Sequence, residues 1–385
     1  MIRATAEPDG GRSGGRVATL LAAVVVAVPL GACQAGDDRA AGSPATSTAT
    51  RAEAVPGGTG VDLASGRDVA TGIDIPWGLA FLPDGDALVG ERDSGRVLRV
   101  PGEGGAPEEV YRVPGVVAQG EGGLLGLAVP PGSDDGGPVY AYLTAASDNR
   151  IVRFRLDGDA APEVLVDGIP KASVHNGGRI AFGPDGMLYA GTGDATDGGA
   201  SQDPDSLAGK ILRLTPDGDP APGNPTPGSP VYSLGHRNVQ GLAWDDEDRM
   251  YAVEFGQNRF DELNRIEPGG NYGWPEVEGR GGDGEGQFVD PLIVWSTDEA
   301  SPSGAVVIGD TLYVAALRGQ RLWTVPLSGG SVGDPVDELR GAHGRLRTVV
   351  EAPDGAMWLT TSNTDGRGDP RPDDDRLIRF PGVGP

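Results

Sequence analysis

The 385-residue sequence has only one cysteine and three histidines. A single cysteine excludes an intrachain disulfide, so no disulfide framework defines the fold. Helical periodicity is almost absent beyond the N-terminus. No Gly-rich fingerprint opens a strand-helix-strand unit, which argues against a bound nicotinamide dinucleotide. These absences favour a chain of strands and exclude the common dinucleotide-binding architecture.

Positive charge is also scarce. The chain has 31 Lys and Arg residues against 56 Asp and Glu residues, and its formal net charge is -25 at pH 7. Nucleic acids and anionic membrane surfaces are held by basic patches, so we expect neither as a partner. Arginines that cluster in such an acidic chain are therefore candidates for a site that binds an anionic ligand.

The N-terminus contains a long apolar run, at residues 17–28, which follows two arginines and precedes Leu-Gly-Ala-Cys33. This order is typical of a secretory signal peptide, and its end resembles a bacterial lipobox, in which the cysteine is lipidated. We expect a lipoprotein signal peptide at 1–32, a lipid on Cys33 and a flexible tether at 33–60. The protein would then be exported and held at the outer face of the cell membrane only through this lipid. An ordinary signal peptide with an unmodified cysteine is the alternative.

Turn-forming residues are abundant, with 65 Gly and 33 Pro, which points to many short strands joined by turns. One pattern recurs six times: apolar residues around a small anchor, in several copies a Pro-Asp-Gly turn, and then an alternating strand such as Met187-Leu-Tyr-Ala-Gly191. The anchors are Ala80, Ala128, Ala181, Ala243, Val306 and Val350. They are 48, 53, 62, 63 and 44 residues apart.

A hairpin-based repeat of roughly 40 to 60 residues is the period of a propeller blade. We therefore predict an all-β fold, a six-bladed β-propeller at residues 61–385. A pair of β-sandwiches is the alternative, but it would not produce this internal similarity. Loops gather at one face of a propeller channel, so we expect the functional site there, on polar residues at strand ends.

Two polar segments precede strands of this repeat. The run His236-Arg237-Asn238 brings an imidazole, a guanidinium and an amide together, and arginine presents a planar fork of donors that matches carboxylates. His175 directly precedes the strand of the third repeat, where it could act as a general base near neutral pH. On these residues alone, a surface ion pair for Arg237 and a loop-stabilising role for His175 remain alternatives.

Three longer motifs carry a family resemblance. They are His175-Asn-Gly-Gly-Arg-Ile-Ala-Phe-Gly-Pro-Asp-Gly, Gly235-His-Arg-Asn-Val-Gln-Gly-Leu-Ala-Trp, and Glu254-Phe-Gly-Gln-Asn-Arg-Phe-Asp-Glu-Leu-Asn264 leading to Gly270-Asn-Tyr-Gly-Trp-Pro. In this order, over roughly residues 70–380, the chain resembles the soluble PQQ-dependent glucose/sorbosone (aldose sugar) dehydrogenases. The resemblance implies oxidation of an aldose at its anomeric carbon to the lactone, with pyrroloquinoline quinone (PQQ) and calcium as cofactors. No haem signature is present, so an external electron acceptor is implied.

The resemblance also implies residue roles. His175 would take the proton from the anomeric hydroxyl, and Arg237 would stabilise the negative charge that develops on the quinone oxygens. The residues assigned to the cofactor are Arg237, Asn238, Arg318, Arg345 and Arg347. The residues assigned to calcium are Gly256 and Gln257, through their carbonyls, and, for a second structural ion, Glu262 and the carbonyl of Tyr272.

Three positions depart from the family pattern, two of them on the substrate side. Glu121 stands where some members have glutamine in the sugar pocket, and Val174 stands where the glucose-oxidising members have aspartate. Gln257 replaces a proline. The natural sugar is therefore left open. The alternatives are a calcium-dependent propeller lactonase and a non-catalytic binding propeller, neither of which needs His175 together with channel-facing arginines.

Overall fold

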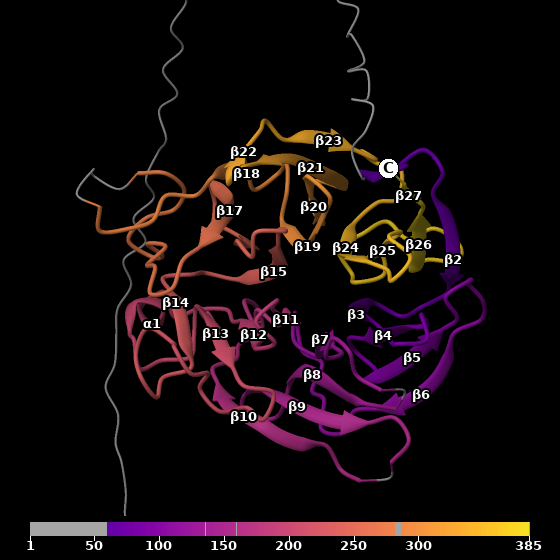
Figure 1. Cartoon of the computed structure of the whole chain (residues 1–385), viewed down its shortest axis with the longest axis horizontal. Helices are drawn as coiled ribbons and strands as arrows, with labels where there is room; N and C mark the ends of the chain where they lie inside the picture. Colours follow the sequence, from indigo (N-terminus) through magenta and orange to yellow (C-terminus); the bar gives the residue numbers. More distant parts are fainter. Residues whose placement is uncertain (1–59, 135, 159, 282–285, 385) are drawn as a thin grey trace, which may run out of the picture. The chain divides into compact units, whose positions relative to one another are not determined.

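The computed structural model describes residues 60–134, 136–158, 160–281 and 286–384. The predicted signal peptide, Cys33 and the tether up to residue 59 lie outside the described residues. The described chain forms six small antiparallel sheets arranged around a central axis (Figure 1). The predicted all-β, six-bladed propeller is confirmed.

Five blades consist of consecutive strands. They are β3 (Pro76–Phe81), β4 (Ala87–Glu91), β5 (Arg96–Val100) and β6 (Glu108–Arg112); β7 (Leu124–Ala128), β8 (Pro138–Thr144), β9 (Asn149–Arg155) and β10 (Glu163–Ile169); β11 (Ile180–Phe182), β12 (Leu188–Gly191), β13 (Lys210–Leu214) and β14 (Val231–Leu234); β15 (Val239–Trp244), β16 (Met250–Glu254), β17 (Phe260–Ile266) and β18 (Ile293–Ser296); and β19 (Pro302–Ile308), β20 (Thr311–Ala316), β21 (Arg321–Ser328), β22 (Ser331–Val332) and β23 (Val336–Glu338).

The sixth blade joins the two ends of the propeller. Its strands are β2 (Arg67–Thr71), β26 (Arg376–Phe380), β25 (Met357–Thr361) and β24 (Leu346–Glu351), in this spatial order. The antiparallel pairing of β2 with β26 closes the ring, and β1 (Gly60–Val61) pairs with β27 (Gly382–Val383) beside it. Closure with strands from both ends leaves no gap between the first and last blades.

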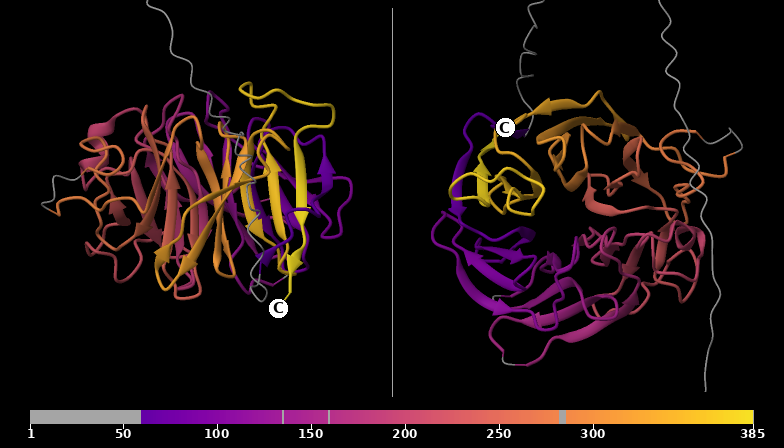
Figure 2. Two further views of the ribbon diagram at one scale, coloured as in Figure 1. Left: turned by 90° about the horizontal axis from the view of Figure 1, so that it is seen from above. Right: turned by 180° about the vertical axis from the view of Figure 1, so that it is seen from behind.

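All six repeat anchors lie on the innermost strands, which are β3, β7, β11, β15, β19 and β24. Glycines allow these strands to approach closely: a Cβ on Gly126 would lie 2.3 Å from the Gly178 carbonyl, and one on Gly304 would lie 2.7 Å from the Thr348 Cα. Five innermost strands are the first of their blades and β24 is the first of the three C-terminal strands of the sixth, so all six run in the same direction along the channel. Their N-terminal ends therefore meet at one face of the propeller. Figure 2 shows the ring edge-on and from behind.

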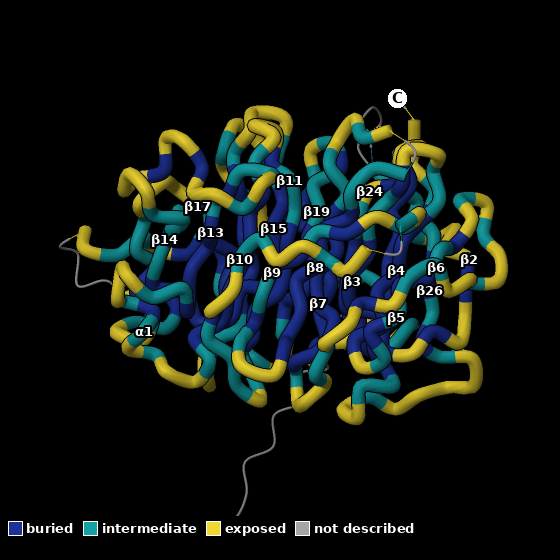
Figure 3. The backbone as a smooth tube through the Cα atoms, turned by 90° about the horizontal axis from the view of Figure 1, so that it is seen from below, coloured by how far each residue is buried: buried dark blue, intermediate teal, exposed yellow. Residues whose placement is uncertain are grey.

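The apolar core lies between neighbouring blades. One cluster joins Tyr251 and Trp295 of one blade with Val314 and Trp323 of the next, and the two tryptophan rings stack at 5.7 Å. The inner strands are buried, outer strands such as β6 and β10 are largely exposed or intermediate, and many loop residues at both faces are exposed (Figure 3). Burial of each large apolar side chain contributes roughly 1.5 to 3 kcal/mol to the free energy of folding. The apolar contacts between blades therefore stabilise the ring.

The helix α1 (Gly198–Gln202) lies in the long connection between β12 and β13 and has five residues. Within the described ranges, no helix has both the length and the apolar character needed to cross a membrane.

Candidate active site

The N-terminal ends of the innermost strands bring most of the predicted polar residues together. Glu121 precedes β7, His175 precedes β11, Arg237 precedes β15, and Arg345 precedes β24. Hydrogen bonds connect the first three residues: the His175 amide donates to Glu121, and the Arg237 guanidinium contacts the His175 ring. Sequence segments more than a hundred residues apart therefore build one site.

The loop that carries His175 has an unusual backbone. His175 has a φ of 59°, in the left-handed region, where histidine is more common than most residues other than glycine. Gly177 follows with a φ of 61°, and a Cβ there would lie 2.5 Å from the Gly191 carbonyl. The His-Asn-Gly-Gly motif therefore bends the chain tightly against β12 and brings the imidazole to Asp194 and Arg237.

The His175 ring lies between a carboxylate and a guanidinium. Its Nδ1 is 2.8 Å from Asp194 Oδ1, and its Nε2 is 2.8 Å from Arg237 Nη2. Because a guanidinium nitrogen only donates, this geometry assigns Nε2 as an acceptor and places the ring proton on Nδ1, donated to Asp194. A lone pair on Nε2 is what a general base needs.

Asp194 is a site residue that the sequence analysis missed. Burial alone would raise the pKa of Asp194, but hydrogen bonds from the His175 ring, the Thr196 amide and Trp274 Nε1 hold that pKa below its ordinary value. The carboxylate therefore stays ionised and fixes the orientation of the imidazole. Its place just after strand β12, as a polar residue at a strand end, is the signal that could have identified it.

Arg237 is a buried cation, with 8% of its surface exposed. Its Nη1 donates to the carbonyls of Phe255 and Gly256 at 3.1 and 2.5 Å, and its Cζ lies 5.4 Å from the Trp274 ring. Burial lowers the pKa of the guanidinium, and its Nε has no hydrogen-bond partner in the described part of the chain. An unsatisfied, desolvated donor of this kind favours binding of an anionic ligand.

His236 does not reach this cluster, which corrects the expectation that its imidazole contributes to ligand binding. Its ring is fully buried, with Nδ1 2.8 Å from Glu254 Oε1 and Nε2 2.8 Å from Ser233 Oγ, and it stacks on Tyr272. The arrangement is that of a Ser-His-Glu triad, but Ser233 is also fully buried and no substrate reaches it. Glu254 accepts the Arg237 amide at 2.6 Å, so this network positions the Arg237 loop.

Asn238 lies next to Arg237, fully buried. Its Oδ1 accepts the Gly177 amide at 3.0 Å, which links it to the His175 loop. Its Nδ2 has no hydrogen-bond partner among the described residues. Asn238 therefore has a structural contact and a free donor at the same face of the channel.

Arg345 and Arg347 share one carboxylate. Arg345 Nη2 is 2.9 Å and Arg347 Nη2 is 3.8 Å from Asp365 Oδ2, and Arg347 Nη1 donates to Gln240 Oε1 at 2.9 Å. Burial lowers the pKa of Arg347 to about 9; Asp365 opposes this shift, and the neighbouring Arg345 and Arg92 add to it. As at Arg237, Nε of Arg347 has no partner within the described ranges. The predicted pair of arginines thus forms a cation-rich patch with few anions.

Arg318 has a separate set of contacts. Its side chain is 61% exposed and pairs with Asp298, itself 75% exposed, at 2.5 Å. The hydrogen bonds and ion pairs of the described residues do not connect it to the channel arginines. Its predicted role in cofactor binding stays a prediction.

Glu121 is held from two sides. One oxygen accepts the His175 amide at 3.0 Å, and the other accepts Arg367 Nη1 at 2.8 Å from the loop between β25 and β26. Burial raises the pKa of Glu121, but these two contacts outweigh it, and the pKa lies below its ordinary value. The carboxylate is 16% exposed beside His175, which suits a substrate contact.

The predicted metal ligands occupy two places. The Gly256 carbonyl accepts Arg237, and Gln257 belongs to a turn in which Glu278 accepts four consecutive backbone amides. Glu262 accepts the Gly279 amide and Asn264 Nδ2, while Tyr272 stacks on His236. In the described part of the chain, no group of three or more His, Cys, Asp or Glu side chains is arranged to hold a metal ion. A calcium site made of backbone carbonyls does not require such a group of side chains. The calcium ligands therefore stay predictions.

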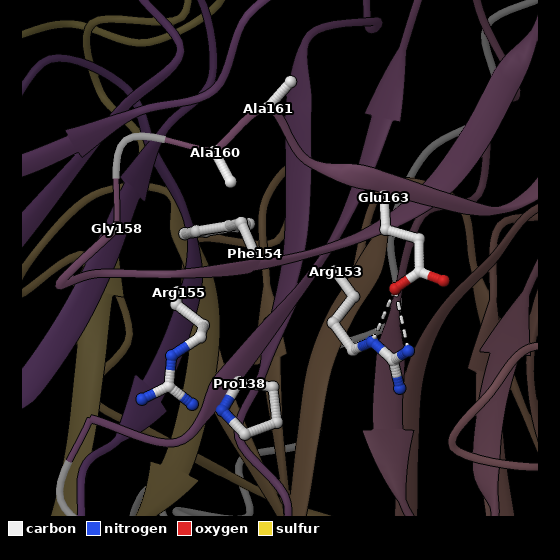
Figure 4. Close-up of a pocket in the computed structure, with 8 residues that line it drawn as sticks. All are labelled: Pro138, Arg153, Phe154, Arg155, Gly158, Ala160, Ala161 and Glu163. Atoms are coloured by element: carbon white, nitrogen blue, oxygen red, sulfur yellow. Dashed lines mark hydrogen bonds and ion pairs between the residues drawn. The ribbon is translucent and has the colours of Figure 1, made fainter.

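The size of a cavity does not locate the site. A cavity of about 460 Å³ lies at the outer edge of one blade, lined by Phe154, Arg155, Ala160 and Ala161, with Arg153 paired to Glu163 beside it (Figure 4). It contains none of the predicted site residues. The convergence of buried arginines with His175 and Asp194 identifies the channel face as the candidate active site.

The chain has close relatives of known family. Residues 73–378 match Glucose / Sorbosone dehydrogenase. The PQQ-bound structure of aldose sugar dehydrogenase from Streptomyces coelicolor shares 56% identity and a TM-score of 0.79, over 83% of this chain and 99% of that chain. Aldose sugar dehydrogenase YliI of Escherichia coli strain K12 is 27% identical over 76% of this chain and 89% of its own length. Quinoprotein glucose dehydrogenase B of Acinetobacter calcoaceticus is 33% identical over 55% and 52%, respectively. The family match covers most of the propeller, and the chain therefore belongs to the glucose/sorbosone dehydrogenase family.

Proposed function

We propose that this protein oxidises an aldose sugar at the anomeric carbon to the lactone, with PQQ as the bound electron acceptor and His175 as the general base. The observation that carries the proposal is the His175 ring, held by Asp194 and facing a buried arginine. The 56% identity to a PQQ-bound aldose sugar dehydrogenase supports the choice of cofactor and substrate class.

The channel face suits PQQ, a planar o-quinone with three carboxylates. Three buried donors of the candidate site have no partner among the described residues: Arg237 Nε, Asn238 Nδ2 and Arg347 Nε. Arg345 and Arg347 would hold cofactor carboxylates, and Arg237 and Asn238 would lie at the quinone oxygens. An anionic ligand would offset the buried positive charge, which is costly to leave uncompensated. When bound, PQQ supplies a two-electron acceptor for hydride.

The protein residues manage the proton and the charge. His175 Nε2 would accept the proton of the sugar's anomeric hydroxyl once Arg237 Nη2, which donates to that nitrogen, releases it, and loss of a hydride to the cofactor would leave the lactone. Asp194 stabilises the imidazolium that forms, because its carboxylate accepts the Nδ1 proton at 2.8 Å. The Arg237 guanidinium is a fixed cation beside the reacting atoms and favours charge that develops there. An external acceptor would then take up the two electrons.

Calcium is part of the proposal, with the carbonyls of Gly256 and Gln257 as ligands of the cofactor's ion. Carbonyl oxygen suits calcium, and the Gly256 carbonyl would exchange its contact with Arg237 for the ion. For the second ion, Glu262 is a buried carboxylate, and Asn264 Oδ1 beside it has no hydrogen-bond partner in the described ranges. An unpartnered acceptor next to a buried carboxylate favours a bound cation, to which Tyr272 would add its carbonyl.

Reconstitution tests this function. Protein purified without cofactor should reduce an artificial electron acceptor in the presence of aldoses only when both PQQ and calcium are added. A nicotinamide dinucleotide should not replace PQQ. Full sugar-dependent activity in chelator without PQQ would overturn the proposal.

We propose further that the protein is exported as a lipoprotein with its lipid on Cys33, because Leu-Gly-Ala-Cys33 ends a signal-peptide-like segment. Cys33→Ala should move the protein out of the membrane fraction and leave its turnover unchanged. Mass spectrometry of the wild type should find the lipid. A variant that remains in the membrane fraction, together with an unlipidated wild type, would contradict this.

A further inference from the structure

The C-terminal ends of the innermost strands form a second mouth of the channel, opposite the candidate active site. A cavity of about 250 Å³ lies there. Each of the six innermost strands contributes an apolar side chain to its wall: Leu79, Leu127, Ala181, Leu242, Ala305 and Val349. The cavity is thus a feature of the whole ring, and none of the residues predicted for the cofactor, the sugar or the metal lines it.

Arg179 closes the inner end of this cavity. Only 7% of the residue is exposed, and its Cζ lies 4.3 Å from the Trp77 ring centre. Nε donates to the Gln240 carbonyl at 2.7 Å, and Nη2 donates to Thr348 Oγ1 at 3.0 Å. Within the described part of the chain, Nη1 has no hydrogen bond and the guanidinium has no carboxylate in an ion pair. Every group that holds this buried cation is neutral.

The charge of Arg179 is therefore uncompensated. Burial and the neighbouring Arg347 lower the pKa of Arg179 to about 9. Arg347 lies 5.7 Å from the same Trp77 ring but faces the other mouth, where Asp365 approaches it. No corresponding carboxylate of the described residues approaches Arg179. A buried cation with a free donor beside a cavity is an incomplete anion site.

We propose that this cavity binds a small monocarboxylate with a compact apolar body, whose carboxylate contacts Arg179 and whose body lies between the six strands. The apolar walls offer no donors for the remaining oxygens of a phosphate or sulfate, which argues for a single carboxylate. Glu351 lines the outer part of the cavity and repels a second negative charge on the ligand. The site does not depend on the proposed function, because no residue of the active site lines it.

Calorimetric titration of the full-length protein with benzoate and with butyrate tests the site. At least one should bind, and the corresponding amide, benzamide or butyramide, should bind at least tenfold more weakly because it lacks the charge that Arg179 compensates. Absence of binding by both acids at millimolar concentration would overturn the proposal. Equal affinity of acid and amide would also overturn it.

Variants then locate the bound acid. Ala181→Leu fills the cavity and leaves Arg179 in place, and Arg179→Gln removes the charge; each should weaken binding at least tenfold. Ala161→Leu, in the cavity at the blade edge, is a matched control and should bind as the wild type does. Arg345→Gln removes a charge at the candidate active site, so weaker binding in this variant would show that the acid binds at the opposite face. Weaker binding in Arg345→Gln with unchanged binding in Ala181→Leu would place the acid at the active site and overturn the proposal, even if Arg179→Gln does not fold.

Discussion

The two mouths of the channel are built from the same six strands but differ in chemistry. At the N-terminal ends, Arg237 and Arg347 are buried, and Nε of each has no partner among the described residues, while the partly exposed His175 contacts Arg237. At the C-terminal ends, side chains such as Leu242 and Val349 form an apolar wall. The difference shows that ring packing needs apolar contacts at only part of each inner strand. The other end is therefore free to carry charged groups that the fold alone would not favour.

A layer of side chains separates the two mouths. Gln240 belongs to both sides, because its carbonyl accepts Arg179 while its side chain accepts Arg347 at 2.9 Å and Ser303 at 3.0 Å. The guanidinium carbons of Arg179 and Arg347 lie 4.3 and 5.7 Å from the centre of the Trp77 ring. The two cations therefore share neutral partners, the Trp77 ring and the oxygens of Gln240. Substitutions at either mouth test whether the mouths act independently.

The largest effect is expected from His175→Ala at the active-site mouth. Loss of the general base should lower kcat by roughly two to four orders of magnitude while PQQ still binds. Glu351→Gln at the opposite mouth is the control and should keep kcat within about twofold of the wild type. Steady-state kinetics at saturating PQQ measures both. Near-normal turnover in His175→Ala would remove the general-base role.

Arg347→Ala should have a smaller effect, on affinity more than on rate. Loss of a buried, charge-assisted contact should weaken PQQ binding by on the order of 1.5 to 3 kcal/mol, and saturating cofactor should restore much of the rate. Arg318→Ala is the matched comparison. Because Arg318 is exposed and paired with Asp298, we expect its loss to weaken PQQ binding by less than about 1 kcal/mol. Equilibrium titration with PQQ decides. Wild-type affinity in Arg347→Ala would contradict its role, and a larger loss in Arg318→Ala would place that residue in the cofactor site.

The sequence predicted the inner strands and most of the active-site mouth because both leave local patterns. The anchors recur with a blade's period, and polar residues such as His175 and Arg237 directly precede strands. Asp365 and Arg367 could not be predicted, since they reach the site from a loop whose sequence position says nothing about its direction. The burial of His236 was also missed, because neighbours in sequence can face opposite ways.

Arg179 shows a further limit of sequence reasoning. It belongs to the same motif as His175, yet it points to the layer between the mouths and lines the apolar cavity. Its charge is uncompensated because no carboxylate of the described residues pairs with it. Whether a carboxylate comes close depends on how six separate strands pack together. Three-dimensional structure was needed to find it.

The smallest effect is expected from Arg367→Gln. This change removes the cation that donates to Glu121, whose other oxygen accepts the His175 amide. Arg367 is 52% exposed, so this ion pair should contribute less than about 1 kcal/mol to the free energy of unfolding. The pKa of Glu121 is lowered in the folded state, so its contribution to stability is present above the ordinary carboxylate pKa and lost as pH falls through the folded value. Urea unfolding should therefore show a small deficit for the variant at pH 7 that shrinks as the pH falls below the ordinary carboxylate pKa. A deficit that grows as the pH falls would show that Arg367 does not stabilise the ionised Glu121. With PQQ and calcium added, the same variant should change KM for the sugar by no more than about fivefold and leave kcat unchanged, because the predicted role of Glu121 is in substrate binding, while His175 keeps its contacts with Asp194 and Arg237.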